Sequence, residues 1–152
     1  MSYWIVGDRQ SGKTTAALKW FMLGQRVDYF PGWSRIFVMS HGEPMRGYVK
    51  SLLNKMWRDE GHIDLPPSQA IITPHELFSP QGIRGRSPKL EYVIDEFNAG
   101  RFMRIYQEYN AVISNINVGV FTMDAEEFPY PGEFTPDQFI DLLNGTATEE
   151  YL

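Results

Sequence analysis

Short apolar runs alternate with longer amphipathic stretches along most of the chain. Runs with the length of buried strands lie at residues 3–6, 36–39, 92–94 and 118–121, and a briefer candidate lies at 70–72. Apolar side chains at helical spacing predict helices over about 13–23, 44–58 and 100–113, and a capped helix start at 73–76. Strands that alternate with helices are typical of βαβ units. The pattern predicts an α/β fold, a three-layer αβα arrangement with a mostly parallel sheet of about five strands.

The pattern changes after residue 123. Residues 124–152 are acidic and interrupted by proline, and they contain one short predicted helix, which begins with a capping box at Thr135 and runs to Leu143. We therefore divide the chain into a core of residues 1–123 and an acidic C-terminal extension of residues 124–152. The whole chain of 152 residues has about the length of one domain.

Composition narrows the class of protein. The contents of 43% hydrophobic and 22% charged residues are typical of a soluble globular protein. No stretch approaches the ~18 to 20 apolar residues of a membrane span, so we expect no membrane partner. The chain has no cysteine, which excludes disulfides and thiolate zinc sites and fits a cytoplasmic location.

Charge is unevenly distributed. Residues up to 104 include 14 basic and ten acidic side chains, which gives +4, whereas the nine acidic side chains from Glu108 onward have no basic counterpart, which gives −9. A mildly basic body suits an anionic partner, and an acidic tail could shield it or contact a basic surface. Ordinary solvated surface is the alternative for both.

A phosphate-binding pattern lies between the first strand and the first helix. The segment Gly7-Asp8-Arg9-Gln10-Ser11-Gly12-Lys13-Thr14 matches G-x-x-x-x-G-K-[ST], the Walker A motif or P-loop. Glycines let backbone N–H groups approach phosphate closely at the positive end of a helix. Lys13 would reach the β- and γ-phosphates, and the Thr14 hydroxyl would bind Mg²⁺. Together with Thr15, this segment predicts ATP or a similar nucleotide as substrate and Mg²⁺ as cofactor.

Two carboxylates follow the strand at residues 92–94, in the form of a Walker B motif. Asp95 would hold Mg²⁺ opposite Thr14, and Glu96 would accept a proton from the attacking water or orient it. The arrangement resembles the additional-strand, catalytic-glutamate class of P-loop NTPases, in which the strand after Walker B ends in a polar sensor. Thr122, directly after the run at 118–121, is the sensor candidate, although threonine also suits strands for its shape alone.

A cation must also neutralise charge on the transferring phosphoryl group. The candidates are Arg9 in the P-loop, Arg84, Arg86 and Arg101, with Arg104 a weaker fifth. An arginine supplied by a neighbouring subunit would require a ring or another homo-oligomer.

Two short segments resemble a more specific family, the viral large terminases that package DNA into phage heads. Residues 9–15 are similar to the variant P-loop of that family, and residues 85–97, preceded by Arg84, are similar to the stretch that leads into its Walker B strand. The resemblance implies that Arg9 contacts the γ-phosphate, that Glu96 is the catalytic carboxylate and that Thr122 is the coupling residue. It also implies double-stranded DNA and a viral portal or capsid as partners, in the host cytoplasm.

Departures from that family leave other functions open. The chain lacks the terminase nuclease domain, as do some small viral packaging ATPases. A helix face with Arg46, Lys50, Lys55 and Arg58 could follow a DNA backbone or could simply be solvated. Residues 11–15 and 94–97 also resemble small thymidine kinases, which suggests a nucleoside or nucleotide kinase, although those enzymes usually carry a cysteine zinc site. A nucleotide-gated interaction module with little turnover is the third hypothesis.

Overall fold

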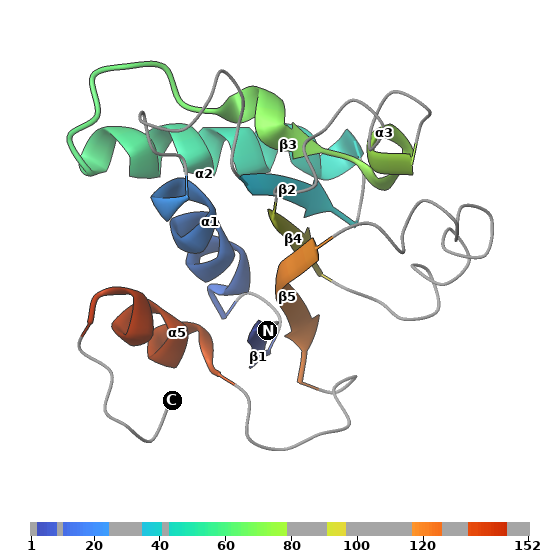
Figure 1. Ribbon diagram of the computed structural model, residues 1–152, viewed down its shortest axis with the longest axis vertical. Helices are drawn as coiled ribbons and strands as arrows, with labels where there is room; N and C mark the ends of the chain where they lie inside the picture. The colour runs from blue at the N-terminus through green and yellow to red at the C-terminus, as the bar shows by residue number, and fades with distance from the viewer. Residues whose placement is uncertain are drawn as a thin grey trace.

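A computed structural model of the chain describes residues 3–8, 11–24, 35–40, 43–78, 91–96, 117–125 and 134–145 (Figure 1). Its strands are β1 (Tyr3–Gly7), β2 (Arg35–Met39), β3 (Ile71–Ile72), β4 (Glu91–Asp95) and β5 (Asn117–Asp124). They form a five-stranded sheet in the order β1-β5-β4-β2-β3, and each neighbouring pair is parallel. The predicted α/β fold with a parallel sheet of five strands is confirmed.

Helices cover both faces of this sheet. They are α1 (Lys13–Leu23), α2 (Arg46–Asp59), α3 (Pro74–Phe78) and α5 (Pro136–Leu143), with single 3-10 turns at Glu43–Met45 and Ser68–Ala70. Figure 1 shows α1 and α5 on one side of the sheet and α3 on the other, as right-handed crossovers require for this strand order. None of the described helices is both long enough and apolar enough to cross a lipid bilayer. The helix predicted over 100–113 lies outside the described residues.

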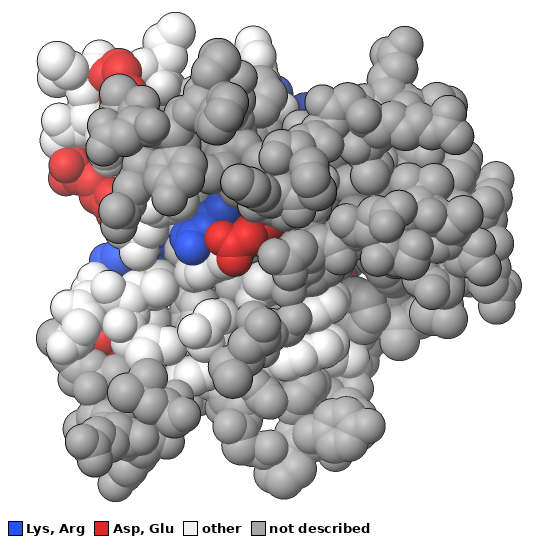
Figure 2. Space-filling view, viewed as in Figure 1, with Lys and Arg blue, Asp and Glu red and all other residues white. Residues whose placement is uncertain are grey.

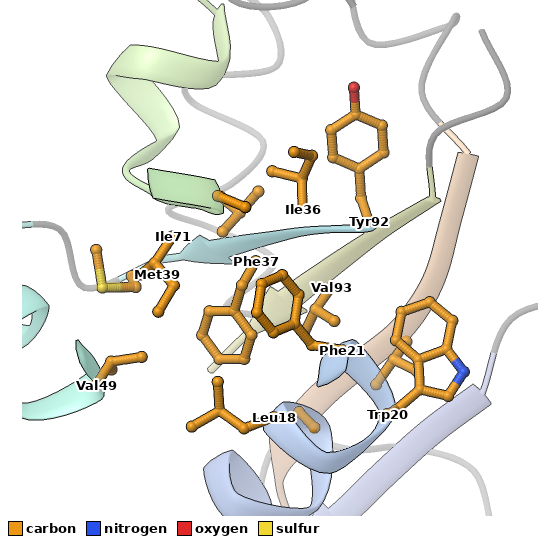
Figure 3. Close-up of a cluster of buried hydrophobic side chains, with 14 of the residues drawn as sticks. Leu18, Trp20, Phe21, Ile36, Phe37, Met39, Val49, Ile71, Tyr92 and Val93 are labelled. Atoms are coloured by element: carbon orange, nitrogen blue, oxygen red, sulfur yellow. The ribbon is translucent and has the colours of Figure 1, made fainter. Parts of the chain in front are cut away.

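The core lies between α1 and the sheet. Phe21 of α1 meets Phe37 of β2 edge to face, with ring centroids 6.0 Å apart, and both rings are fully buried. Figure 3 shows Leu18 and Val93 beside this pair. Burial of a side chain of this size contributes about 1.5–3 kcal/mol. Because α1 begins at Lys13, packing of its apolar face also fixes the position of the P-loop that precedes it.

The C-terminal segment joins the sheet through one residue. The Phe134 carbonyl accepts a hydrogen bond from the Val6 N–H at 2.8 Å, and the Phe134 N–H donates one to the Trp4 carbonyl at 3.2 Å. The helix α5 follows, with the predicted capping box between Thr135 and Gln138, and its Phe139 is fully buried. Residues 134–143 therefore pack directly against β1 and α1.

The strand β5 is longer than its apolar run at 118–121. It continues through Thr122 to Asp124, because Thr122 pairs in register with Ile5 and Asp124 pairs with Gly7. Thr122 thus lies inside the strand and not directly after it. The polar residues at its end do not stop the strand, since both find polar partners within the site described below.

Candidate functional site

Parallel strands bring residues 7–8, 95–96 and 122–124 to the same edge of the sheet. Gly7 ends β1, Asp95 ends β4 and Asp124 ends β5. The carboxyl edge of such a sheet is where α/β proteins usually bind ligands. The candidate site therefore consists of the P-loop and of the ends of β4 and β5.

Two glycines give the P-loop its shape. A Cβ atom on Gly7 would lie 2.4 Å from the Ser11 hydroxyl, so a larger residue here would require the Ser11 side chain to move. Gly12 has φ +92°, a left-handed conformation that side chains other than glycine rarely adopt, and it is the N-cap of α1. The turn is closed by a hydrogen bond from the Ser11 N–H to the Asp8 carbonyl at 3.1 Å.

Lys13 extends from the first turn of α1 back beneath the P-loop. Its ammonium donates to the carbonyls of Gly7 at 3.1 Å and Asp8 at 2.9 Å. It also donates to Asp124 Oδ1 at 3.0 Å and lies 3.5 Å from Glu96 Oε1. Only 1% of the side chain is exposed. A buried ammonium is stable only with such partners, so this cation is fixed at the centre of the site.

Asp95 connects the Walker A and Walker B segments. Its Oδ2 accepts a hydrogen bond from the Thr14 hydroxyl at 3.0 Å, and its Oδ1 accepts one from the Thr122 hydroxyl at 2.7 Å. Burial raises the pKa of Asp95 to about 6, and the negative charge of Glu96 adds to the rise. The two threonine hydrogen bonds and Lys13 act against the rise, since they stabilise the carboxylate.

Glu96 has an unusual backbone conformation. With φ of 51° it is in the left-handed region, where a residue other than glycine costs about 1–2 kcal/mol. Its N–H donates to the Thr122 hydroxyl at 2.6 Å, which holds this conformation in place. The turn directs the half-buried side chain toward Lys13.

The oxygen atoms of Thr14 and Asp95 fit a magnesium ion. Mg²⁺ prefers hard oxygen ligands, usually binds one or two carboxylates, and keeps several waters or phosphate oxygens. A carboxylate and a hydroxyl 3.0 Å apart, beside the Walker A segment, supply the protein part of such a set. Among the residues that the structure describes, no group of three or more His, Asp or Glu could hold a metal by itself. A bound Mg²⁺ would therefore depend on phosphate oxygens and water to complete its coordination.

The sequence-predicted site residues divide into two groups. The structure brings together Gly7, Asp8, Ser11, Gly12, Lys13, Thr14, Asp95, Glu96 and Thr122, and it has Thr15 half-buried in the first turn of α1. Arg9, Gln10, Arg84, Arg86 and Arg101 lie outside the described residues, as does Arg104.

Sequence reasoning missed Asp124. Its carboxylate contacts Lys13, and its place in the strand could have been inferred from period-two alternation, which puts Val120, Thr122 and Asp124 on one face of β5. The acidic residues that follow Asp124 concealed it, because they make it resemble the start of the tail.

Not all of the basic side chains predicted on one face of the second helix are available to a partner. Arg46 at the start of α2 forms an ion pair with Glu76 of α3. Lys55 and Arg58 are exposed, whereas Lys50 is half-buried. On the face drawn in Figure 2, the coloured basic and acidic side chains are intermixed.

The hydroxyl of the fully buried Thr122 hydrogen-bonds to both the Asp95 carboxylate and the Glu96 N–H. A substitution of Thr122 therefore tests both contacts. We expect Thr122→Val to lower the free energy of unfolding by about 2–3 kcal/mol, because the partly buried Glu96 N–H and the buried Asp95 carboxylate each lose a partner. Thr122→Ser keeps the hydroxyl and is expected to cost about 1 kcal/mol for the lost methyl group. Urea denaturation of the three proteins measures both changes. A valine variant as stable as the serine variant would contradict the assigned hydrogen bonds.

No protein-family model matches the chain, and a search of curated proteins finds no significant match.

Proposed function

We propose that the chain binds a nucleoside triphosphate, taken to be ATP, together with Mg²⁺ and hydrolyses its γ-phosphate. The observation that carries the proposal is the contact between segments 81 residues apart, the 3.0 Å hydrogen bond from Thr14 to Asp95. A P-loop alone is compatible with many phosphate ligands. A P-loop whose threonine meets a buried aspartate and whose lysine meets a glutamate has the groups that phosphoryl transfer to water requires.

Each residue has a distinct role in the proposed reaction. The N–H groups around Ser11 and Gly12 and the ammonium of Lys13 bind the phosphate oxygens. Glu96 orients a water molecule for attack on the γ-phosphorus and receives its proton. The bond from that phosphorus to the β–γ bridging oxygen breaks, and ADP and phosphate leave. Thr14 and Asp95 would hold Mg²⁺, which supplies charge neutralisation to the β- and γ-phosphate oxygens when bound.

The charge of the described site explains why cations are essential to this proposal. One lysine faces three carboxylates, those of Asp95, Glu96 and Asp124, before the negative charge of a triphosphate is added. This excess of negative charge disfavours ATP binding without a divalent cation. It also requires further positive charge at the γ-phosphate, for which Arg9, Arg84, Arg86 and Arg101 are the candidates.

Hydrolysis is tested by measuring ATP binding and phosphate release with Mg²⁺ and with EDTA. We expect binding and turnover with Mg²⁺, and affinity at least about tenfold weaker with EDTA, because the carboxylates then repel the phosphates. Lys13→Ala is the control, and we expect it to lose binding. Phosphate release that is equally fast with EDTA would contradict the proposed site.

The same assay separates the proposal from its competitors. Phosphate transfer to an added nucleoside or nucleotide in place of water would indicate a kinase. Binding without either reaction would indicate a nucleotide-gated interaction module. Faster release on addition of double-stranded DNA would support a packaging motor, the finer proposal that rests on the resemblance of residues 9–15 and 85–97 to terminases.

A further inference from the structure

The number of hydrogen bonds at Lys13 limits what this residue can bind. An ammonium group has three N–H donors. The carbonyls of Gly7 and Asp8 and the carboxylate of Asp124 accept one hydrogen bond each, at 3.1, 2.9 and 3.0 Å. All three donors are therefore used by oxygen atoms of the protein. A phosphate oxygen can bind Lys13 only if one of these acceptors leaves.

The two carbonyls are poorly placed to leave. The Gly7 carbonyl also accepts the N–H of Ala125 at 3.1 Å, which ties the P-loop to the end of β5. The Asp8 carbonyl also accepts the N–H of Ser11, which closes the P-loop turn. Displacing either one would deform the loop that has to bind the phosphates.

The Asp124 carboxylate can leave without deforming the backbone. Its side chain is 39% exposed, so water can solvate the carboxylate once it turns away from Lys13. The Lys13 side chain is 1% exposed and has no such freedom. The exchangeable partner of Lys13 is thus the carboxylate and not a carbonyl.

We infer that Asp124 is a positioning residue that competes with phosphate for Lys13, an inference that rests on the proposed function. The carboxylate occupies the third donor of the ammonium and keeps the buried cation paired. A phosphate group of the nucleotide takes its place on binding, and Asp124 turns toward water. The affinity of the site for phosphate is consequently lowered by the strength of the Lys13–Asp124 pair.

This exchange takes place on the strand that also orients the catalytic acids. Thr122 lies two residues before Asp124 on the same face of β5, and its hydroxyl contacts both Asp95 and the Glu96 N–H. Release of Asp124 therefore takes place at the end of β5, beside the two Walker B carboxylates.

The test compares Asp124→Asn with the wild type. Asparagine keeps the shape and one acceptor but forms a neutral, weaker hydrogen bond to Lys13, and it removes one negative charge near the phosphates. We expect Mg²⁺-ATP and inorganic triphosphate to bind about tenfold more tightly to this variant.

The matched control is Asp137→Asn, which removes one charge from an exposed carboxylate of α5. This carboxylate follows Pro136, which lies against Gly7. We expect the control to change both dissociation constants by less than about twofold. Isothermal titration calorimetry measures the dissociation constants of both ligands for the wild type and the two variants.

A second measurement distinguishes competition from a purely structural role. Asp124→Asn should lower the urea midpoint of the nucleotide-free protein more than that of the ATP-saturated protein, because the lost ion pair exists only before binding. Equal losses in both, or unchanged or weaker binding of both ligands, would overturn the inference.

Inorganic triphosphate separates this inference from the proposed function. If the wild type hydrolyses no ATP, the proposed function fails, yet tighter triphosphate binding by Asp124→Asn still supports the competition. A protein that binds neither ligand in any of these forms contradicts both.

Discussion

Replacement of Glu96 by glutamine is expected to slow phosphate release by about 10²- to 10⁴-fold, the range that a positioned general base contributes. ATP affinity should change by only a few-fold. Glutamine keeps the length of the side chain but cannot accept the proton of the attacking water. Because Lys13 keeps its other partners, the P-loop should stay formed. Single-turnover phosphate release and equilibrium ATP binding measure the two quantities separately.

The matched control lies on the same strand. Glu91 begins β4 and pairs with Arg35 at the opposite edge of the sheet from Glu96. We expect Glu91→Gln to leave turnover within about twofold, since its contribution is that of a half-exposed ion pair. Full turnover in Glu96→Gln would remove Glu96 from the mechanism, and an equal loss in both variants would point to a general defect of the strand.

The backbone conformation of Glu96 agrees with the role proposed for its carboxylate. A left-handed glutamate at the end of a buried strand is costly, and such conformations persist where the surrounding structure enforces them. Here the enforcing contact is the 2.6 Å hydrogen bond from the Glu96 N–H to Thr122. That contact turns the carboxylate toward Lys13 and away from the continuation of the strand.

Local features of the fold were predictable because they depend on neighbours in the sequence. The bounds of α1 follow from Gly12, Lys13 and the apolar stripe that ends at Leu23. The capping boxes at Thr73 and Thr135 need only a residue three positions later, and both are present. The meeting of the Walker segments also follows from general topology, since parallel strands end at the same edge.

Pairing between distant segments was not predictable in this way. Nothing in the spacing of apolar residues identifies β5 as the strand between β1 and β4. The bridge from Phe134 to Ile5 involves one residue, which has no periodicity to detect. The contact from Asp124 to Lys13 joins residues 111 positions apart, and only the register of β5 against β1 brings them together. Sequence reasoning found the residues of the two motifs and the strand at 118–121, but not the position of that strand between β1 and β4.

Replacement of Asp95 by asparagine is expected to stabilise the nucleotide-free protein while abolishing Mg²⁺-dependent turnover. Burial raises the pKa of Asp95 from its usual value of 3.8 to about 6, so ionisation at neutral pH costs the folded state about two pKa units. Each unit corresponds to about 1.36 kcal/mol, which gives a gain of about 1–3 kcal/mol on removal of the charge. The Thr14 and Thr122 hydroxyls can both hydrogen-bond to an asparagine amide, so the variant should pack normally.

The pH dependence of this gain has a definite sign. A carboxyl group with a raised pKa binds its proton more tightly in the folded than in the unfolded protein, so its contribution to stability is lost as pH rises from about 4 to about 6. The advantage of Asp95→Asn over the wild type should therefore be full above pH 6 and should vanish near pH 4. Urea denaturation of both proteins across this range measures it. Asp137→Asn, at an exposed position of α5, should show no comparable gain.

Opposite effects of one substitution on stability and turnover would identify Asp95 as a functional residue. If the carboxylate only supported the fold, its replacement would destabilise the protein, because the hydrogen bonds from Thr14 and Thr122 to a charged acceptor are stronger than those to a neutral amide. A carboxylate kept for a bound cation instead destabilises the protein until that cation neutralises it, and perturbed groups of this kind are concentrated at active sites. If Asp95→Asn proves less stable than the wild type at pH 7.5, the buried charge is structural. The magnesium site proposed between Thr14 and Asp95 would then lose its main support.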